Sequence, residues 1–487
     1  MMTRLARRLD RGALISAFSA PVLSLLAMSL VTFGAACSSS KPAPTPVATV
    51  PLAAADPPPA DPKATPPDDV GPEEAAKQQR RIARMLKKVS GVRGLETKKE
   101  VPGRTLARER LLARVKEHVA RELPPATIRD EGLVLQLLGF VPVAFDYEKE
   151  MFALLEAQIA GYYEPADRTM YMAADLDEEN AQATLAHELV HALQDQNWDL
   201  AARSKYKPGH GDEASARSAL AEGDATSAML DVIIEGTGRT ALDMPEALFS
   251  SSIAQGMEKG PGSSAPHVMR AGLIAPYLDG TLFVHALRRK GGWEAVNRAW
   301  EKAPVTSEQI LHIDKYEAHE PAIEVSVPTR NALGAGWNEK ETDVYGELGV
   351  RIYFAEWMDE ETAHTVAAHW GGDRGVLLEK GKNEFAFAWR IRYDAGPRGK
   401  PAAYAEKAYA ALVPAIEAKV GPAKKQPASS ACVARQGLGP IAVLRKGRDL
   451  MIAVGPTEMG AAASKETSDC ALMQKWLAEL GAATPAP

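Results

Sequence analysis

The stretch from Asp177 to Gln196 constrains the fold more than any other part of the chain. It contains neither proline nor glycine, and Asp177 is a favourable N-cap, so it predicts one unbroken helix. Within it, the run His187-Glu188-Leu189-Val190-His191 places two histidines four residues apart. Residues at this spacing lie one turn apart on one helix face, so both imidazoles can reach one metal ion. The stretch therefore predicts a buried helix on which His187 and His191 are ligands of a zinc ion.

The remaining parts of such a site can also be proposed from the sequence. Glu188 lies beside the ion, where it can accept a proton from an attacking water and pass it to a leaving group. A catalytic zinc needs a third protein ligand, and Glu222 is the preferred candidate because it falls in a predicted helix with small neighbours. The competing candidates are His210, Asp212, Glu213 and Asp224. Asp224 and Asp195 are alternative candidates for the carboxylate that orients a ligand imidazole.

The rest of the chain predicts an α+β protein that is mainly helical. Apolar residues at helical spacing predict helices over 73–123, and further helices follow between 213 and 369. Aromatic runs on either side of a Pro and Asp turn predict a small β-hairpin over 161–173, just before the metal-binding helix. From 371 to 487, two strand–strand–helix units predict a separate C-terminal α+β segment.

The metal motif and the glutamate after it resemble a known family. His187 to His191, followed by Glu222-Gly223-x-Ala225, is similar to the gluzincin class of zinc metallopeptidases. The longer run from His187 to Gln196 also resembles a group of poorly characterised bacterial envelope proteins, in which a G-[FY]-Y-x-P hairpin precedes the zinc helix, here Gly161 to Pro165. Other segments similar to those proteins are Pro276 to Gly280, Gly291 to Val296, Ser307 to His312 and Trp370 to Arg374.

This resemblance implies a zincin-like catalytic domain over 73–370. It implies one zinc ion held by His187, His191 and Glu222, with Glu188 as general base and acid in the hydrolysis of a peptide or protein substrate. Such reactions develop an oxyanion that a tyrosine or histidine often stabilises. His312 and Tyr316 are the candidates for this task because they lie in or beside one of the similar segments.

The amino terminus predicts export from the cytoplasm. Four arginines precede an uncharged run from Gly12 to Ala36, which is the pattern of a secretory signal over 1–36. The run ends at Cys37 and resembles a bacterial lipoprotein signal, in which this cysteine is lipidated. The alternatives are an uncleaved helical anchor and simple cleavage after Ala36. Every alternative places the body of the chain in the cell envelope or outside it.

Two further features fit an exported protein. Eleven of the 34 prolines lie between Pro42 and Pro72, so residues 37–72 predict an extended tether that holds no core. Cys432 and Cys470 are the other two cysteines of the chain, and export allows them to form a disulfide. The alternative is a pair of separate buried thiols.

Nucleic-acid and nucleotide partners are not expected. The net charge is −6, whereas proteins that hold nucleic acid usually carry a basic surplus. The run Gly236-x-Gly238-x-x-Ala241 matches a dinucleotide-binding pattern, but it follows a predicted helix rather than a strand.

The sequence thus favours a zinc metallopeptidase held in the bacterial envelope by a lipid or helical anchor. Three alternatives stay open at this point. They are a non-catalytic binding or assembly protein on a zinc-stabilised fold, a zinc hydrolase of a non-peptide bond, and a metal-free scaffold.

Overall fold

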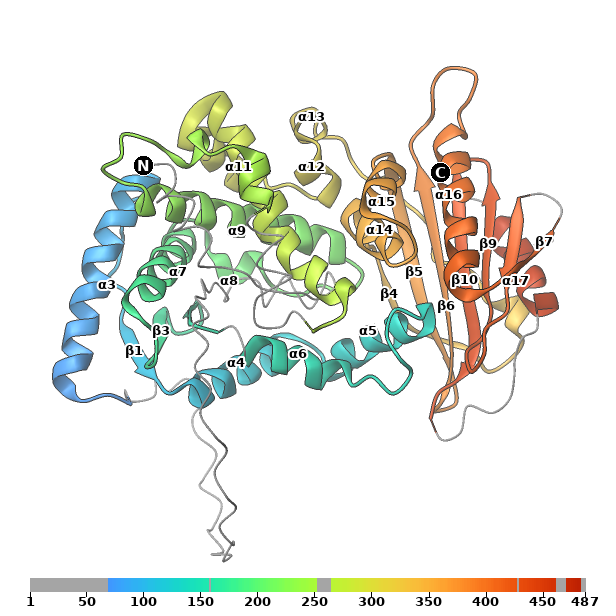
Figure 1. The fold of residues 1–487 in the computed structure, drawn as a ribbon, viewed down its shortest axis with the longest axis horizontal. Helices are drawn as coiled ribbons and strands as arrows, with labels where there is room; N and C mark the ends of the chain where they lie inside the picture. Colours follow the sequence, from blue (N-terminus) through green and yellow to red (C-terminus); the bar gives the residue numbers. More distant parts are fainter. Residues whose placement is uncertain (1–68, 157–158, 252–263, 427–428, 461–469, 483–487) are drawn as a thin grey trace, which may run out of the picture.

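The computed structural model describes residues 69–156, 159–251, 264–426, 429–460 and 470–482. Helices and two separate sheets make up these residues, so the expected α+β class is confirmed. In Figure 1 a helical part fills one end of the molecule, and a large sheet with its own helices forms the other end. The predicted signal, Cys37 and nearly all of the predicted tether lie outside the described residues. Within the described residues, no helix has the length and apolar character needed to cross a bilayer.

The helical part is built from helices of 4 to 35 residues. Proline at the first turn begins both α3 and α5, where a missing N–H costs nothing. The helices are α3 (Pro72–Arg93), α4 (Arg108–Glu122), α5 (Pro125–Leu138), α6 (Tyr147–Glu156), α7 (Glu178–Trp198), α8 (Leu200–Arg203), α9 (Gly211–Ile233), α11 (His267–Glu301), α12 (Ser307–Leu311) and α13 (Ile313–Ala318), with the 3-10 turn η2 (Ala241–Asp243). Gly291 and Gly292 have non-helical backbone angles, so α11 is two helices joined at a kink.

A three-stranded sheet lies beside α7. The predicted hairpin is present as β2 (Gly161–Glu164) and β3 (Thr169–Ala173), which pair in antiparallel fashion. A third strand, β1 (Gly103–Leu106), pairs in parallel with β3, so the order is β1-β3-β2 and β2 is an edge strand. The expectation that 73–123 is only helical is therefore wrong. Helix α3 ends at Arg93 with Gly94 as a left-handed C-cap, and the strand that begins at Gly103 joins the hairpin.

Helices α7, α9 and α11 form the centre of the helical part. Both faces of α7 are buried, because α3, α9 and β2 all pack against it. The contact between α9 and α11 is close enough to require glycine. A Cβ placed on Gly223 would lie 2.1 Å from the carbonyl carbon of Gly280, and a Cβ on Gly280 would lie 2.0 Å from the carbonyl oxygen of Ala219. The two helix backbones therefore touch at the level of Glu222.

The second sheet has seven strands in the order β4-β5-β6-β10-β9-β8-β7. Alternate residues face opposite sides of it, as expected for strands covered on both faces. Leu377, Phe387 and Ile452 pack in the cluster that includes α16, whereas Leu378, Ala388 and Met451 pack in the cluster that includes α17. The elements are η3 (Asn331–Leu333), β4 (Asn338–Asp343), α14 (Gly346–Ala355), α15 (Glu360–Ala367), β5 (Trp370–Lys380), β6 (Glu384–Tyr393), α16 (Ala403–Val420), β7 (Ala423–Gln426), β8 (Ser430–Val433), β9 (Ile441–Lys446), β10 (Asp449–Glu458) and α17 (Cys470–Ala482).

This sheet starts earlier in the chain than residue 371, the predicted start of the C-terminal segment. Strand β4 pairs with β5 along the edge of the sheet, although its sequence, Asn-Glu-Lys-Glu-Thr-Asp, has no apolar residue. An edge strand needs few buried side chains, and so it leaves little trace in the sequence. The two cysteines expected to pair are joined in the structure: a disulfide links Cys432 of β8 to Cys470 of α17, with Cα atoms 6.0 Å apart.

Candidate metal centre

The three expected ligands converge in the interior of the helical part. The Nε2 atoms of His187 and His191 are 3.0 Å apart, and Oε2 of Glu222 lies 3.0 Å from the first and 3.6 Å from the second. All three side chains are fully buried. These atoms form one of two groups in the described residues whose spacing suits a metal ion.

The local sequence explains why these side chains meet. Asp177 accepts a hydrogen bond from the backbone N–H of Asn180, which fixes the start of α7 and so the phase of its histidines. Both histidines sit on the same face of α7, one turn apart. Glu222 reaches them from α9, which lies close to α7 and α11 because its neighbours are small, including Gly223.

Zinc fits the geometry and the chemistry of these residues. Zinc bonds to nitrogen and oxygen of about 2.0–2.2 Å in a tetrahedral arrangement would hold ligand atoms roughly 3.3 Å apart. The measured separations of 3.0, 3.0 and 3.6 Å bracket this value. In addition, Oε1 of Glu222 and Oε1 of Glu188 are buried with no hydrogen-bond partner among the described residues. Two buried carboxylates beside two imidazoles are a costly arrangement unless a cation balances them.

The ligand residues are shifted away from their ordinary ionisation. Burial lowers the pKa of His187 to about 4. Burial also opposes the charge of His191, but the Glu222 carboxylate outweighs it and raises the pKa of His191 to about 9. The two histidines in turn hold the pKa of Glu222 below its usual value, although burial acts in the opposite direction. A metal ion must therefore displace the proton that the raised pKa keeps on His191 near neutral pH.

Glu188 lies next to the ligands, and it contacts the small sheet. Its Oε2 accepts a hydrogen bond of 2.9 Å from the backbone N–H of Tyr163 in the edge strand β2. Burial raises the pKa of Glu188 to about 8. A carboxylate with its pKa near neutrality is suited to both accepting and donating a proton.

Asp195 does not orient an imidazole, so that candidate role is wrong. Its Oδ2 accepts a hydrogen bond of 2.9 Å from the hydroxyl of Tyr163, and its Oδ1 accepts the backbone N–H of Leu200 at 3.1 Å. Asp195 therefore ties the end of α7 to β2 and α8. The residue that contacts a ligand imidazole is Gln194, whose Oε1 lies 2.8 Å from Nδ1 of His191.

Sequence reasoning missed Gln194, although its position carried a signal. It follows His191 by three residues, which places it on the same face of α7. Asp224, the other candidate for orienting an imidazole, acts one step further away. Its Oδ2 lies 3.2 Å from Nε2 of Gln194, and it does not contact either histidine directly.

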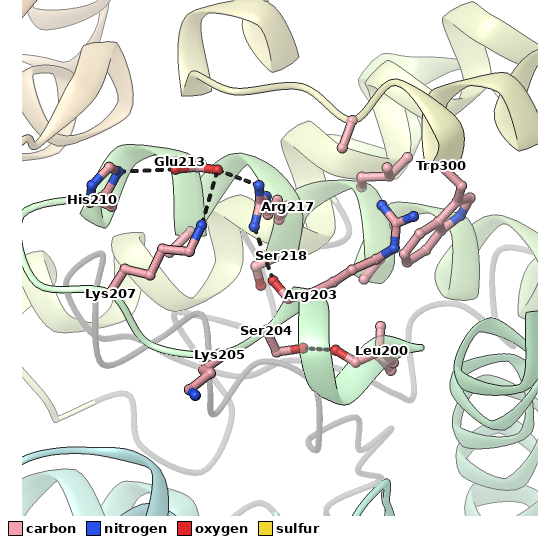
Figure 2. Close-up of a pocket in the computed structure, with 14 residues that line it drawn as sticks. Leu200, Arg203, Ser204, Lys205, Lys207, His210, Glu213, Arg217, Ser218 and Trp300 are labelled. Carbon is pink, nitrogen blue, oxygen red and sulfur yellow. Dashed lines mark hydrogen bonds and ion pairs between the residues drawn. The ribbon is translucent and has the colours of Figure 1, made fainter. Parts of the chain in front are cut away.

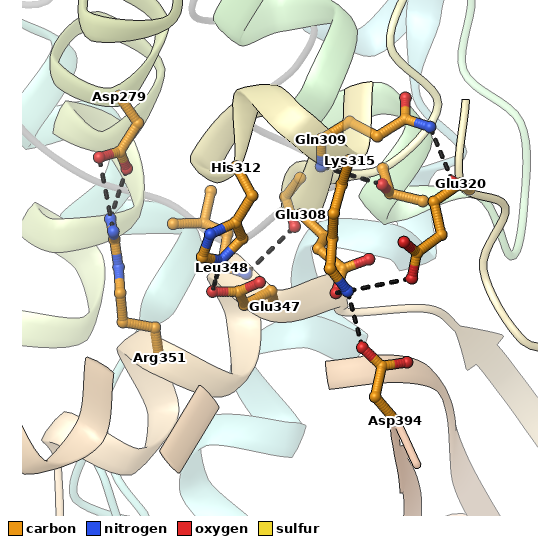
Figure 3. A network of polar contacts seen from close by, with 12 residues as sticks. Asp279, Glu308, Gln309, His312, Lys315, Glu320, Glu347, Leu348, Arg351 and Asp394 are labelled. Atoms are coloured by element: carbon orange, nitrogen blue, oxygen red, sulfur yellow. Dashed lines mark hydrogen bonds and ion pairs between the residues drawn. The ribbon is translucent and has the colours of Figure 1, made fainter. Parts of the chain in front are cut away.

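His312 and Tyr316 have partners away from the metal centre, so their expected role at the oxyanion is not supported. Figure 3 shows His312 pointing to Glu347 of α14, with its Nε2 2.9 Å from Oε1. The hydroxyl of Tyr316 donates to the backbone carbonyl of Lys302 at 3.0 Å, and its ring packs against Phe283. Neither side chain pairs with the candidate ligands or Glu188 among the interactions of the described residues.

Tyr277 of α11 is the aromatic residue that lies over a ligand. Its ring centroid is 5.9 Å from that of His187, and it is half-buried whereas the ligands are fully buried. It belongs to the Pro276 to Gly280 segment, which the sequence marked as similar to envelope proteins but assigned no role.

The second group with metal-like spacing is filled by an ammonium. Glu308, Glu320 and Asp394 surround Nζ of Lys315, which contacts Glu308, lies 3.1 Å from Glu320 and lies 2.7 Å from Asp394 (Figure 3). These contacts join α12 and α13 to the end of β6. The cluster is therefore an ion-pair network between the helical part and the large sheet.

A small cavity of about 30 Å³ lies on another side of α9, between α8 and the loop that follows it. Figure 2 shows that Lys207, His210 and Arg217 on its rim all point to Glu213, which pairs with each of them. His187, His191 and Glu222 do not line this cavity, whereas His210 and Glu213, two of the competing candidates for the third ligand, do. The cavity is thus separate from the metal centre, and four lysine and arginine side chains line it against the single carboxylate of Glu213.

A known protein family matches part of the chain. Residues 332–465 match a family described only as a domain of unknown function, DUF8575. The matched region runs from the turn before β4 past the end of β10, so it covers all seven strands of the large sheet and none of the metal centre. No curated protein matches the chain.

Proposed function

We propose that the chain is a zinc-dependent metallopeptidase of gluzincin type. The observation that carries the proposal is the convergence of His187, His191 and Glu222 in a fully buried site with Glu188 beside them. A zinc ion held there would act as a Lewis acid and would lower the pKa of a water molecule that attacks a carbonyl group. The residues of this chain would supply everything else.

Glu188 is the proton carrier in this proposal. One of its oxygens is fixed by the N–H of Tyr163, and the other has no partner among the described residues. The free oxygen can take a proton from the attacking water and later deliver it to the leaving amine. Burial disfavours the charged form of Glu188, which helps the same carboxyl to hold that proton between the two steps.

The small sheet favours a peptide as the substrate. β2 pairs with β3 alone in this sheet. Its Tyr163 N–H is donated to Glu188 on the side away from β3, and all four residues of the strand are buried, so a peptide would align with this edge only where the covering side chains move apart. An extended peptide that aligns with such an edge strand makes main-chain hydrogen bonds and lies across the neighbouring residues. A peptide in this position would bring a carbonyl group towards Glu188.

We place this activity in the bacterial cell envelope. The proposal rests on the secretory pattern of residues 1–36 and on the proline-rich tether of residues 37–72. Lipidation of Cys37 or an uncleaved helix would hold the enzyme at the membrane. The disulfide between Cys432 and Cys470 fits an oxidising compartment.

The test compares Glu188→Gln with the wild-type full chain. Purified wild-type protein should contain about one equivalent of zinc and cleave unfolded protein substrates, as followed by mass spectrometry. Glu188→Gln should keep the zinc and lose cleavage by at least about 100-fold, because general base catalysis typically contributes that much. Glu131→Gln is the matched control, since Glu131 is also a buried glutamate but belongs to α5, outside the metal site.

Other outcomes separate the alternatives. Absence of zinc in the wild type, or full cleavage by Glu188→Gln, would refute the proposed mechanism. Zinc that depends on His187 but no cleavage of any peptide would instead favour a hydrolase of another bond or a non-catalytic envelope module.

A further inference from the structure

The two candidate imidazole ligands are held differently by the protein. Nδ1 of His187 is buried and has no hydrogen-bond partner among the described residues. Nδ1 of His191, in contrast, lies 2.8 Å from Oε1 of Gln194. Of these two rings, it is therefore the His191 ring whose orientation is fixed by a residue outside the candidate ligands.

The amide of Gln194 can point in only one direction. Its Nε2 lies 3.0 Å from the backbone oxygen of Ala221 and 3.2 Å from Oδ2 of Asp224, so both amide protons have acceptors. Exchanging the amide oxygen and nitrogen would place an oxygen against these two oxygens and remove both bonds. Gln194 is fully buried, so no water can replace the lost partners cheaply.

This orientation decides which nitrogen of His191 faces the metal site. Because Oε1 of Gln194 is only an acceptor, Nδ1 of His191 must carry the proton of that hydrogen bond. The lone pair of a neutral His191 is then on Nε2, the atom that points to His187 and Glu222. A hydrogen bond of this kind sets the tautomer of a ligand imidazole and its orientation.

Asp224 is itself fixed from two other helices. Nε and Nη2 of Arg93, in α3, lie 2.5 and 3.2 Å from its two oxygens, and the indole N–H of Trp300, in α11, donates to it at 2.8 Å. Arg93 and Asp224 are both fully buried, and the Arg93 guanidinium lies 4.5 Å from the ring centroid of Trp293. With both carboxylate oxygens engaged, Asp224 presents an acceptor to Gln194 at a fixed place.

We propose that Gln194 is a positioning residue for the metal centre, oriented by Asp224 and Arg93, and that it presents His191 with Nε2 ready to bind zinc. The inference rests on the proposed function for the identity of the metal, but the hydrogen bond to His191 can be measured without metal. Helices α3 and α11 supply no metal ligand, but through Arg93 and Trp300 they help to position one.

The test replaces Gln194 with methionine, which has a similar shape and neither accepts from Nδ1 nor donates to Asp224. Zinc affinity, measured on the full chain by competition with a chromophoric chelator, should fall about 10- to 100-fold. The control is Gln309→Met. Gln309 is likewise buried and makes hydrogen bonds to Val305 and Glu320, in α12 outside the metal site.

A conservative variant and a metal-free measurement complete the test. Gln194→Glu keeps an acceptor for Nδ1 but sets its second oxygen against the oxygens of Ala221 and Asp224, so it should retain the Nδ1 proton while binding zinc more weakly than the wild type. In metal-free protein labelled with ¹⁵N-histidine, the Nδ1 proton of His191 should give a slowly exchanging downfield resonance that is absent in Gln194→Met and present in Gln309→Met. The His191→Ala variant assigns that resonance.

The outcomes separate this inference from the proposed function. A wild-type protein that binds no zinc but shows the His191 resonance, lost in Gln194→Met, would end the zinc proposal and leave the positioning role in place. The positioning role itself is overturned if Gln194→Met keeps the resonance, or if its zinc affinity drops no further than that of Gln309→Met.

Discussion

The close contact between α9 and α11 predicts that a glycine-to-alanine substitution lowers the free energy of unfolding there, whereas the same substitution in an open helix raises it. A Cβ on Gly223 would lie 2.1 Å from both the carbon and the oxygen of the Gly280 carbonyl group and 2.7 Å from the nitrogen of Thr281. All three are backbone atoms, so no side-chain rotation can relieve the overlap. In Gly223→Ala, α9 and α11 must separate by roughly 1 Å or more to reach an ordinary contact distance of about 3.5 Å.

The magnitude follows from two opposing terms. Overpacking of a well-packed interior costs about 1–3 kcal/mol, and a backbone clash belongs at the upper end of that range. Replacing a helical glycine by alanine returns about 1 kcal/mol through helix propensity. We therefore expect Gly223→Ala to lower the free energy of unfolding by about 2 kcal/mol.

Gly91 is the matched control. It also lies inside a helix, α3, but a Cβ there would meet no atom within 4 Å. With no clash to offset propensity, Gly91→Ala should raise the free energy of unfolding by about 0.5–1 kcal/mol. The two variants should thus differ by about 3 kcal/mol although each adds a single methyl group.

Urea unfolding followed by circular dichroism measures both effects. Gly223 is adjacent to Glu222, so displacement of α9 should also weaken zinc binding in Gly223→Ala and leave it unchanged in Gly91→Ala. If Gly223→Ala unfolds at the wild-type urea concentration with wild-type zinc affinity, the two backbones are not in the contact described here and the reasoning fails.

Three further predictions concern other parts of the molecule. Lys315→Met should lower the free energy of unfolding by about 2 kcal/mol, because it leaves buried Glu308 without its cation. Adding Glu308→Gln to this variant should restore most of the lost stability in a thermal melt. If the double variant shows no recovery, the ion-pair network is contradicted. Burial raises the pKa of Asp343 to about 7, well above its ordinary 3.8. The folded protein therefore binds a proton at Asp343 more tightly than the unfolded chain does. The stability that this proton contributes is fully present below about pH 4 and is lost as the pH rises to about 7. Relative to Asp343→Asn, the wild type should therefore lose up to about 4 kcal/mol between those limits, and parallel stability curves for the two proteins would refute the shift. Reduction of the Cys432–Cys470 disulfide should cost about 2–4 kcal/mol, and Cys432→Ala should match the reduced wild type in urea unfolding.

The metal helix could be predicted from the sequence because it combines several independent signals. An N-cap, an unbroken helical stretch and two histidines one turn apart all specify the same element, and the structure places Glu222 against both. The hairpin before it was equally clear, since aromatic strands and a Pro and Asp turn rarely occur together otherwise.

Elements that depend on partners far away in the chain could not be predicted. Strands β1 and β4 are short and largely polar or interrupted by glycine, and each exists because a neighbouring strand offers it hydrogen bonds. In the same way, the expectation for His312 and Tyr316 followed a similar segment rather than a contact, and tertiary packing gave both residues other partners.

The candidate site shows the same division between local and distant information. Spacing alone places His187, His191 and Gln194 on one face of α7, so a careful local reading would have included the glutamine. Arg93 could not have been found in this way, because 131 positions separate it from Asp224 and nothing in the local sequence connects them.

The distribution of these residues bears on how the two ends of the molecule relate. The metal centre draws side chains from α3, α7, α9 and α11, so it requires the helical part as one folded unit. The family of unknown function matches residues 332–465, where the large sheet supplies none of these side chains. The helical part therefore carries the candidate chemistry, and the sheet is joined to it through contacts such as the Lys315 network. The function of the matched family therefore concerns the sheet and not the metal centre. The proposed hydrolysis must be tested by substitutions in the helical part.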